Sequence, residues 1–292
     1  MKNFIFSSTT LLPKFKIVRP QLQICDYVQE ICSLITRLLI QNIRRPSLII
    51  TGILQPLLWL VIFGALFQNA PIAMFTPINE YKYFISAGII VFTVFTSALN
   101  AGLPIIFDRE FGFLNRLLIT PLSSRYSILV SSSFNIILVS LVQVALIIFS
   151  CYQIGYCLTS NSNVFLVIAI LLLLSFSITN LSIMLAFQVP GHVELLACIL
   201  IINLPLLFSS TALAPLIFMP SWLQIIASIN PLSYAIEIIR YAYLYQEWQI
   251  YTTIMDTVWG PIKLVDIVLI LIFLYLISFT YIKKLISNKF EE

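Results

Sequence analysis

Six long runs without a charged side chain divide this chain of 292 residues and limit what it can fold into. They cover residues 47–67, 83–107, 127–150, 164–187, 195–214 and 267–282. Each is near the ~20 residues that a helix needs to cross the hydrocarbon core of a bilayer. The chain is 60% hydrophobic and only 10% charged, whereas soluble domains carry roughly 25% charged residues. The sequence therefore predicts an all-α, polytopic membrane protein with six transmembrane helices.

The basic residues predict the orientation of these helices. If the N-terminus is cytoplasmic, 13 of the 16 Lys and Arg residues fall on the cytoplasmic side, and only Lys82, Arg240 and Lys263 fall elsewhere. Cytoplasmic loops of membrane proteins carry such an excess of positive charge. We therefore expect both termini and the loop around residues 107–121 on the cytoplasmic side, and residues 215–266 on the opposite side.

The segment before the first run predicts an amphipathic helix. Residues 1–23 form a basic tail without the apolar core and cleavage site of a signal peptide. From residue 24 to about residue 42, one arc of the predicted helix carries Ile24, Tyr27, Val28, Ile31, Leu34, Ile35, Leu38 and Leu39. Such a helix lies in the membrane interface, or alternatively packs on a soluble partner. We divide the chain into residues 1–46, the tail and interfacial helix, and residues 47–292, the transmembrane domain.

The densest charge cluster in the interior of the chain lies between the second and third runs. On one continuous helix from Phe107 to Pro121, one face would carry Phe107, Phe111, Leu114 and Leu118. The opposite face would carry Arg109, Gly112 and Arg116, with Asp108 and Asn115 beside them. Pro121 would end the helix, because proline has no N–H to donate. The pattern predicts a surface helix that offers its charged side to a soluble protein; the alternative is an ordinary hydrated loop.

Candidate catalytic and metal-binding residues are scarce. None of the six runs contains Asp, Glu, Lys or Arg, which argues against transport coupled to protons or ions. The single histidine, His192, has Glu194 nearby, but a zinc site needs further ligands, so we interpret it as a loop histidine at a helix start. The chain lacks a phosphate-binding loop for ATP. Five cysteines show no metal-binding spacing, although Cys151 and Cys157 share one predicted loop. The basic residues form no stripe, so we expect no nucleic-acid binding.

Two motifs carry a family resemblance. The run Asp108-Arg109-Glu110-Phe111-Gly112, followed by Leu114, Arg116-Leu117-Leu118 and Thr120-Pro121, resembles the cytoplasmic loop after the second span of ABC-2 type permeases. These are the membrane subunits of one class of ATP-binding-cassette exporters. The segment after that family's fifth span resembles Ala214-Pro215-Leu216, Met219-Pro220, Trp222-Leu223, Asn230-Pro231-Leu232-Ser233-Tyr234 and Arg240. The resemblance extends from about Ile24 to the end of the chain, and is greatest to the drug-export-like branch and to permeases encoded in red-algal plastid genomes.

The resemblance implies a permease subunit that pairs with a second copy, most simply as a homodimer, among membrane lipids. A separate ABC ATPase subunit would bind ATP and Mg, so no cofactor is expected on this chain. The predicted contacts of the coupling helix with that ATPase are Asp108, Arg109, Glu110, Phe111, Gly112, Leu114, Arg116, Leu117, Leu118 and Pro121. The predicted outer re-entrant segment contains Pro215, Pro220, Trp222, Asn230, Pro231, Tyr234 and Arg240. Phe113 departs from the family pattern, in which many members have a smaller or polar residue.

Other interpretations stay open. The substrate class is drug-like molecules, lipids or lipid-linked glycans, and the membrane is that of a plastid, with stromal termini, or a bacterial inner membrane. A membrane-embedded enzyme or assembly factor without transport activity is the main alternative, and a channel or secondary carrier is a third. The outer aromatic residues predict either a headgroup belt or an exit gate: Tyr234, Tyr241, Tyr243, Tyr245, Trp248, Tyr251 and Trp259. Pro104, Asn203 and Pro205 are the candidate points of helix deformation.

Overall fold

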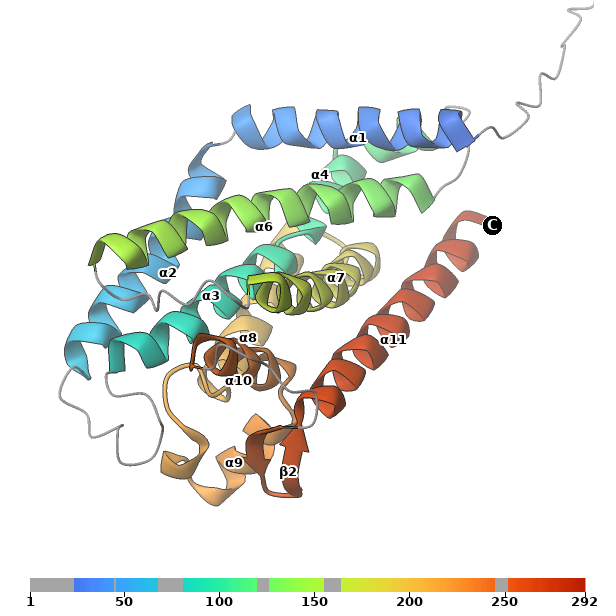
Figure 1. Ribbon diagram of the computed structural model, residues 1–292. Helices are drawn as coiled ribbons and strands as arrows, with labels where there is room; N and C mark the ends of the chain where they lie inside the picture. Colours follow the sequence, from blue (N-terminus) through green and yellow to red (C-terminus); the bar gives the residue numbers. More distant parts are fainter. Residues whose placement is uncertain are drawn as a thin grey trace, which may run out of the picture.

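The structure, a computed structural model, is a bundle of helices with one small β-hairpin (Figure 1). It describes residues 24–44, 46–67, 81–119, 126–154, 164–244 and 252–291. The first five helices are α1 (Ile24–Arg44), α2 (Pro46–Leu66), α3 (Tyr81–Leu99), α4 (Gly102–Glu110) and α5 (Phe113–Ile119). They are followed by α6 (Tyr126–Ile154), α7 (Val164–Gln188), α8 (His192–Phe208), η2 (Leu216–Phe218), α9 (Ser221–Ile229), α10 (Pro231–Leu244), β1 (Thr253–Thr257), β2 (Gly260–Lys263) and α11 (Leu264–Glu291).

The helix α3 is the centre of the bundle and packs against α2, α6, α7 and α10. Within an apolar 18-residue stretch of residues 84–110, 78% of the residues are buried, compared with 22% for such a stretch of residues 264–285 in α11. The α3 side chains Phe84, Phe92 and Phe95 are among the largest that are fully buried. A helix that is apolar all round suits such a central position, because every face meets another helix. By contrast, α11 lies at the periphery and packs mainly against α7.

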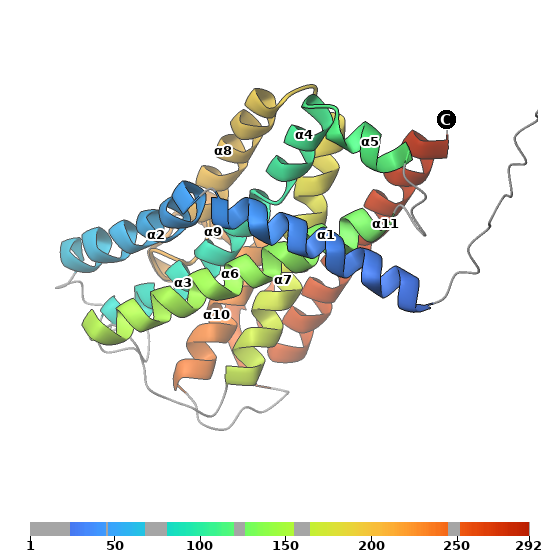
Figure 2. The ribbon, with the colours of Figure 1, turned by 90° about the horizontal axis from the view of Figure 1, so that it is seen from above.

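The segment predicted to form the N-terminal amphipathic helix is helical, as α1, whereas its location in the membrane interface stays a prediction. It lies at one end of the bundle and crosses α6 (Figures 1 and 2). Its Leu34 and Leu38 are buried, whereas Val28, which belongs to the same predicted arc, is 51% exposed. The Asn42 side chain donates a hydrogen bond of 3.0 Å to the Asn135 side chain on α6. Part of the apolar face of α1 is therefore covered by this chain's own α6.

Most of the described residues of the six apolar runs are helical, but the helices differ in length. Among the described residues, four helical segments are long and apolar enough to cross a membrane, and they cover residues 84–110, 130–153, 164–188 and 264–285. Two apolar helices, Ile50–Leu66 and His192–Phe208, are shorter. The run predicted to end at Ala214 ends as a helix at Phe208, because the hydroxyls of Ser209 and Ser210 turn back to the carbonyls of the last helical turn.

The second predicted span, residues 83–107, is broken in two. Helix α3 ends at Leu99 and α4 begins at Gly102, and the hydroxyl of Ser182 on α7 bridges the break. This hydroxyl accepts a hydrogen bond of 2.9 Å from the Gly102 N–H and donates one to the Leu99 carbonyl. The break lies directly before Pro104, which occupies the first turn of α4, where a missing N–H costs little. The side chain from α7 thus satisfies backbone groups that would otherwise be unpaired within the bundle.

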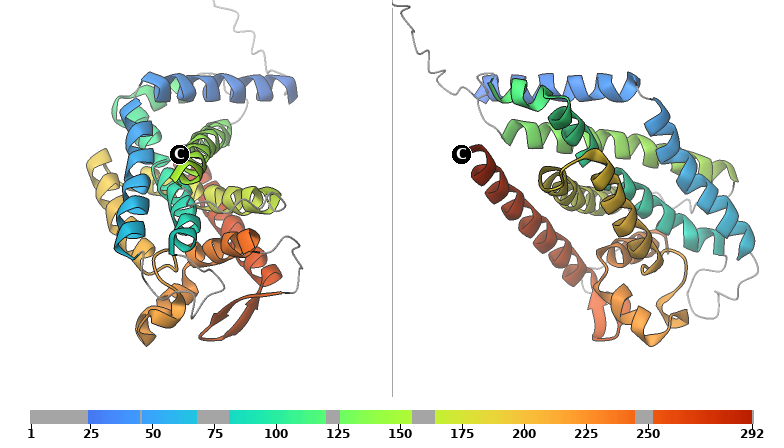
Figure 3. Two further views of the ribbon diagram at one scale, coloured as in Figure 1. Left: turned by 60° about the vertical axis from the view of Figure 1, so that its left-hand side comes forward. Right: turned by 180° about the vertical axis from the view of Figure 1, so that it is seen from behind.

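The stretch between α8 and α11 folds at the end of the bundle opposite α1 (Figure 3). Helices α9 and α10 are bent by 82° at Asn230, which is the geometry of either a broken span or a re-entrant loop. Strands β1 and β2 pair as an antiparallel hairpin between α10 and α11. This hairpin was not predicted from the sequence, which indicated helices only. We call this region the hairpin end, and the opposite one the α1 end.

Candidate functional site

The segment of residues 107–121 is not the single helix that the sequence predicted. Helix α4 ends at Glu110, and α5 begins at Phe113 after a turn in which Gly112 has φ +71°. Glycine adopts this left-handed conformation without steric strain, so Gly112 suits the turn. The prediction of one apolar face was wrong for this reason: Leu114 is 5% exposed, whereas Phe111 is 76% exposed. Pro121 lies outside the described residues.

Helix α5 is seated by a small hydrophobic cluster. Leu114 packs with buried side chains of α4, α7 and α11, namely Ile105, Ile183, Phe187 and Ile282. Figure 2 shows α5 between the end of α4 and the last turns of α11. The outward side of the segment carries Phe111, Arg116 and Ile119, all of which are exposed. The exposed surface of the segment is therefore the turn and one side of α5.

Arg109, which the sequence predicted on a polar face towards a soluble partner, points towards the end of α7. Its guanidinium donates hydrogen bonds to the carbonyls of Ala186 at 2.9 Å and Pro190 at 2.7 Å, and also to that of Val189. The last carbonyls of a helix have no partner within the helix and carry partial negative charge. Arg109 supplies a positive charge and donors at this end of α7. It is therefore no longer grouped with Arg116 on one polar face.

Glu110 performs the complementary task at the start of α8. Its Oε1 accepts a hydrogen bond of 2.6 Å from the backbone N–H of His192, and its Oε2 lies 2.7 Å from His192 Nδ1. The preceding residue, Gly191, has no side chain to cap the helix. A carboxylate at a helix N-terminus is favourable because the free N–H groups there carry partial positive charge. His192 does start a helix, as predicted, and Glu110 is the partner that the sequence did not identify.

Asp108 connects the same segment to α1. Arg37 donates to Asp108 at 2.6 Å, and the Arg37 guanidinium lies 4.0 Å from the centre of the Phe113 ring. The three consecutive charged residues 108–110 therefore contact three different elements: α1, the end of α7 and the start of α8. We call these contacts the α4 junction. No group of three His, Cys, Asp or Glu side chains suited to a metal ion occurs in the described part of the chain.

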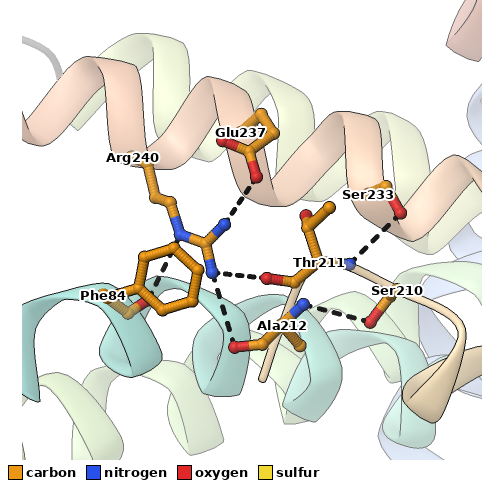
Figure 4. A network of polar contacts seen from close by, with 7 residues as sticks. All are labelled: Phe84, Ser210, Thr211, Ala212, Ser233, Glu237 and Arg240. Carbon is orange, nitrogen blue, oxygen red and sulfur yellow. Dashed lines mark hydrogen bonds and ion pairs between the residues drawn. The ribbon is translucent and has the colours of Figure 1, made fainter. Parts of the chain in front are cut away.

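A second polar network lies at the hairpin end, around Arg240 of α10 (Figure 4). Arg240 is 3% exposed, pairs with Glu237 at 2.5 Å, and donates to the carbonyls of Phe84 at 3.2 Å and Thr211 at 2.6 Å. Its guanidinium carbon lies 3.4 Å from the centre of the Phe84 ring. We call these contacts the Arg240 network. It joins α10, α3 and the loop after α8.

The other residues predicted for the outer segment shape its bends. The Asn230 side chain donates to the Leu206 carbonyl at 2.7 Å and accepts a bond of 3.0 Å from the Leu232 N–H, which caps α10 just before Pro231. Pro215 and Pro220 directly precede η2 and α9. Trp222 is 64% exposed on α9.

The predicted aromatic group is divided between the interior and the surface. Tyr234 is 5% exposed and its hydroxyl donates to the Ser228 carbonyl, whereas Trp259 is 64% exposed. Tyr234 is therefore a packed core residue. Tyr245, Trp248 and Tyr251 lie outside the described residues, as does Cys157.

Comparison with known proteins agrees with the motifs. A family model described as ABC-2 type transporter matches residues 29–244, which is more than half of the chain. A protein of Porphyra purpurea named "Putative transport permease ycf38" is 49% identical over 287 residues, covering 98% of this chain and 99% of the relative. Proteins of the same name from Pyropia yezoensis and Cyanophora paradoxa are 47% and 48% identical, covering 99% and 90% of this chain and 99% and 91% of their own lengths. The chain therefore belongs to the ABC-2 type transporter family.

Proposed function

We propose that this protein is the permease subunit of an ATP-binding-cassette exporter that moves a hydrophobic or amphipathic substrate across a membrane. It works as a homodimer, and a separate ATPase subunit binds ATP and Mg and drives transport. Membership of the ABC-2 type transporter family supports the permease assignment, and the absence of a phosphate-binding loop from the sequence supports a separate ATPase. The six apolar helical runs fit six spans, with the two shorter helices close to the lower limit of length.

The α4–α5 turn is the proposed contact with the ATPase. The observation that supports this proposal is that one side of the turn is attached to the bundle and the other side is exposed. The charged residues 108–110 hold the turn to α1, α7 and α8, whereas Phe111 and Arg116 are exposed. A contact that transmits movement needs such an arrangement, because the residues beside the exposed turn pass its movement on to α1, α7 and α8.

The α1 end is proposed to face the cytoplasm or stroma, since most of the basic residues then lie on that side. The resemblance to permeases of red-algal plastid genomes supports a plastid membrane, with a bacterial inner membrane as the alternative.

The test is to purify the protein together with its ATPase and to replace the exposed turn residues, as Phe111→Ser with Arg116→Glu. We expect at least tenfold weaker association with the ATPase and an equal loss of partner-dependent ATP hydrolysis, since central aromatic and Arg contacts dominate most interfaces. The unfolding temperature should stay the same, because neither side chain is buried. Trp222→Ser is the matched control, an exposed aromatic residue at the hairpin end, and it should leave association intact.

Unchanged association of the double variant would show that the turn is a hydrated loop and not the contact. If no ATPase copurifies with the unmodified protein, the main alternative, a membrane protein without transport activity, would be favoured.

A further inference from the structure

A pocket of about 240 Å³ lies within the bundle, between α1, α2, the α3–α4 break, α6 and α8. Eight of its lining side chains are uncharged amides or hydroxyls: Gln41, Asn42, Thr51, Gln55, Thr96, Ser97, Asn100 and Gln143. The apolar lining residues include Leu103, Pro104, Phe107, Ile136, Val139 and Leu196. None of the lining residues is Asp, Glu, Lys or Arg. The pocket thus combines many neutral hydrogen-bonding groups with an apolar wall.

Several of these polar side chains lie in segments that are otherwise strongly apolar. Thr96, Asn100 and Gln143 belong to the stretches of residues 84–110 and 130–153, both long and apolar enough to cross a membrane. A neutral polar group in such surroundings costs free energy unless it is hydrogen-bonded. Some of the lining groups have partners: Asn42 donates to Asn135 at 3.0 Å, and Thr96 to Asn203 at 3.5 Å.

Two acceptors differ from these. The Oε1 atoms of Gln143 and Gln41 are buried and accept no hydrogen bond from any described residue. Gln143 is only 4% exposed, so its amide can meet a ligand or water only within the pocket. Opposite it on α2 lies Gly52, where any Cβ would collide with the Gln143 Nε2. The glycine therefore leaves the room that this amide occupies.

The pocket opens between α2 and α8. Of its lining residues, Thr51 and Gln55 on α2 are exposed, and Leu196 on α8 is 45% exposed. The neighbouring surface carries exposed apolar side chains, including Leu54 at 51% and Leu200 at 61%. An apolar chain attached to a ligand in the pocket would therefore find an apolar surface at the mouth.

The chemistry of the lining selects the ligand. An ionised group would lose its hydration without gaining an opposite charge, which makes charged head groups unfavourable. The hydroxyl groups of a ligand can donate to the two free amide oxygens of the pocket. They can also accept hydrogen bonds from the amide N–H groups and the threonine hydroxyls of the lining. The volume is below the roughly 300–1,000 Å³ of pockets that enclose a drug-sized ligand, so it suits a head group more than a whole amphiphile.

We propose that this pocket binds the uncharged, hydroxyl-bearing head group of an amphiphile, whose hydroxyls donate to Oε1 of Gln143 and of Gln41. The proposal rests on the proposed function, in that it names the substrate class of the exporter. It assigns Gln143 and Gln41 to recognition, and Gly52 to leaving space for Gln143.

The test uses the full chain in lipid nanodiscs with two photoreactive probes that share the same acyl chains. One is a monoglycosyl diacylglycerol and the other a phosphatidylglycerol. We expect the glycolipid to label peptides of α2 and α6 several times more strongly than the anionic lipid, with competition by an unlabelled alkyl glucoside. Gln143→Leu should lower glycolipid labelling about three- to tenfold, the value of one hydrogen bond. Gly52→Val should lower it too, because its side chain displaces the Gln143 amide.

Gln143→Leu is expected to fold, since it removes a buried acceptor that has no partner in the described structure. Gln153→Leu is the matched control: it changes the same residue type on α6, at an exposed position away from the pocket, and should leave labelling unchanged. Equal labelling by both lipids, or unchanged labelling of Gln143→Leu, would overturn the proposal.

Partner-dependent ATP hydrolysis, measured in the same nanodiscs, separates the two proposals. Hydrolysis without selective labelling would overturn the pocket assignment alone. Selective labelling that depends on Gln143, without an ATPase partner, would support the pocket while the exporter function fails.

Discussion

The two arginine-centred networks at opposite ends of the molecule differ in how they hold it together. In the Arg240 network, one buried guanidinium joins α10, α3 and the loop after α8, and its side chain is 4% exposed. In the α4 junction, three consecutive residues each contact a different element, and the side chains of Arg37 and His192 are 30% and 42% exposed. Charged contacts are stronger where water is excluded. The hairpin end is therefore locked, whereas the α4 junction consists of separate, weaker contacts.

This difference fits the proposed function, in which the ATPase acts at the α1 end and not at the hairpin end. An ATPase that moves the α4–α5 turn needs a junction whose contacts can be exchanged one at a time. The opposite end needs a fixed geometry, because α10 and the loop after α8 must stay packed against α3. The Tyr81 hydroxyl adds to this fixed end by donating to the Leu213 carbonyl at 2.9 Å. Burial raises the pKa of the Tyr81 phenol to about 12, so it keeps its proton at physiological pH.

The largest effect is expected from Arg240→Leu. It leaves the carbonyls of Phe84 and Thr211 and the carboxylate of Glu237 without their donor, so we expect a loss of about 3–5 kcal/mol in the free energy of unfolding. The measurement is the midpoint of thermal unfolding in detergent, which should fall by on the order of 10 °C. Arg116→Leu, at an exposed position, is the control and should change little. A wild-type midpoint for Arg240→Leu would mean that the hairpin end is not locked by this residue.

A smaller effect on the free energy of unfolding is expected from substitutions of two glycines, Gly88 and Gly112, and the cost should differ between them. A Cβ at Gly88 would lie 2.7 Å from the carbonyl oxygen of Ala212, next to the Arg240 network, so Gly88→Leu must displace backbone and should cost about 3 kcal/mol. At Gly112 there is open space, and Gly112→Ala should cost only the left-handed backbone strain of about 1 kcal/mol. Denaturant unfolding of both variants tests this order. Gly112→Asn should recover most of its loss, since asparagine adopts this conformation more readily than alanine does.

The smallest effect is expected for the ion pair between Arg37 and Asp108. A double-mutant cycle with Arg37→Ala and Asp108→Ala should give a coupling energy of about 1 kcal/mol or less, because both side chains are partly exposed. The coupling should weaken further in high salt. The same cycle on Arg240 and Glu237 provides the comparison and should give the larger value. Equal coupling energies at the two ends would remove the distinction between a locked and an exchangeable network.

Some features of the fold could be predicted because they depend on local composition. The position of each apolar run and the amphipathic pattern of α1 follow from the preference of each side chain for water or hydrocarbon. The bends at Pro220 and Asn230 follow from local backbone chemistry, since both residues begin helices readily. Helix α8 ends six residues before the predicted end of its run, because Ser209 and Ser210 interrupt it. The apolar run therefore predicted where this helix lies in the sequence, but not the residue at which it ends.

What the sequence by itself determined is that the chain spans a membrane with helices and carries the motifs of its family. The tertiary structure decided the partners of its few charges: Arg109 with carbonyls at the end of α7, Glu110 with the start of α8, and Arg240 of α10 with α3 and the loop after α8. It also decided that the segment turns at Gly112, between α4 and α5, because Leu114 can enter the cluster with Ile183 and Ile282 only if α5 departs from the axis of α4. The transfer free energy of a segment is a property of its own residues. The partner of a buried charge depends on which distant segments come together, and no local pattern records that.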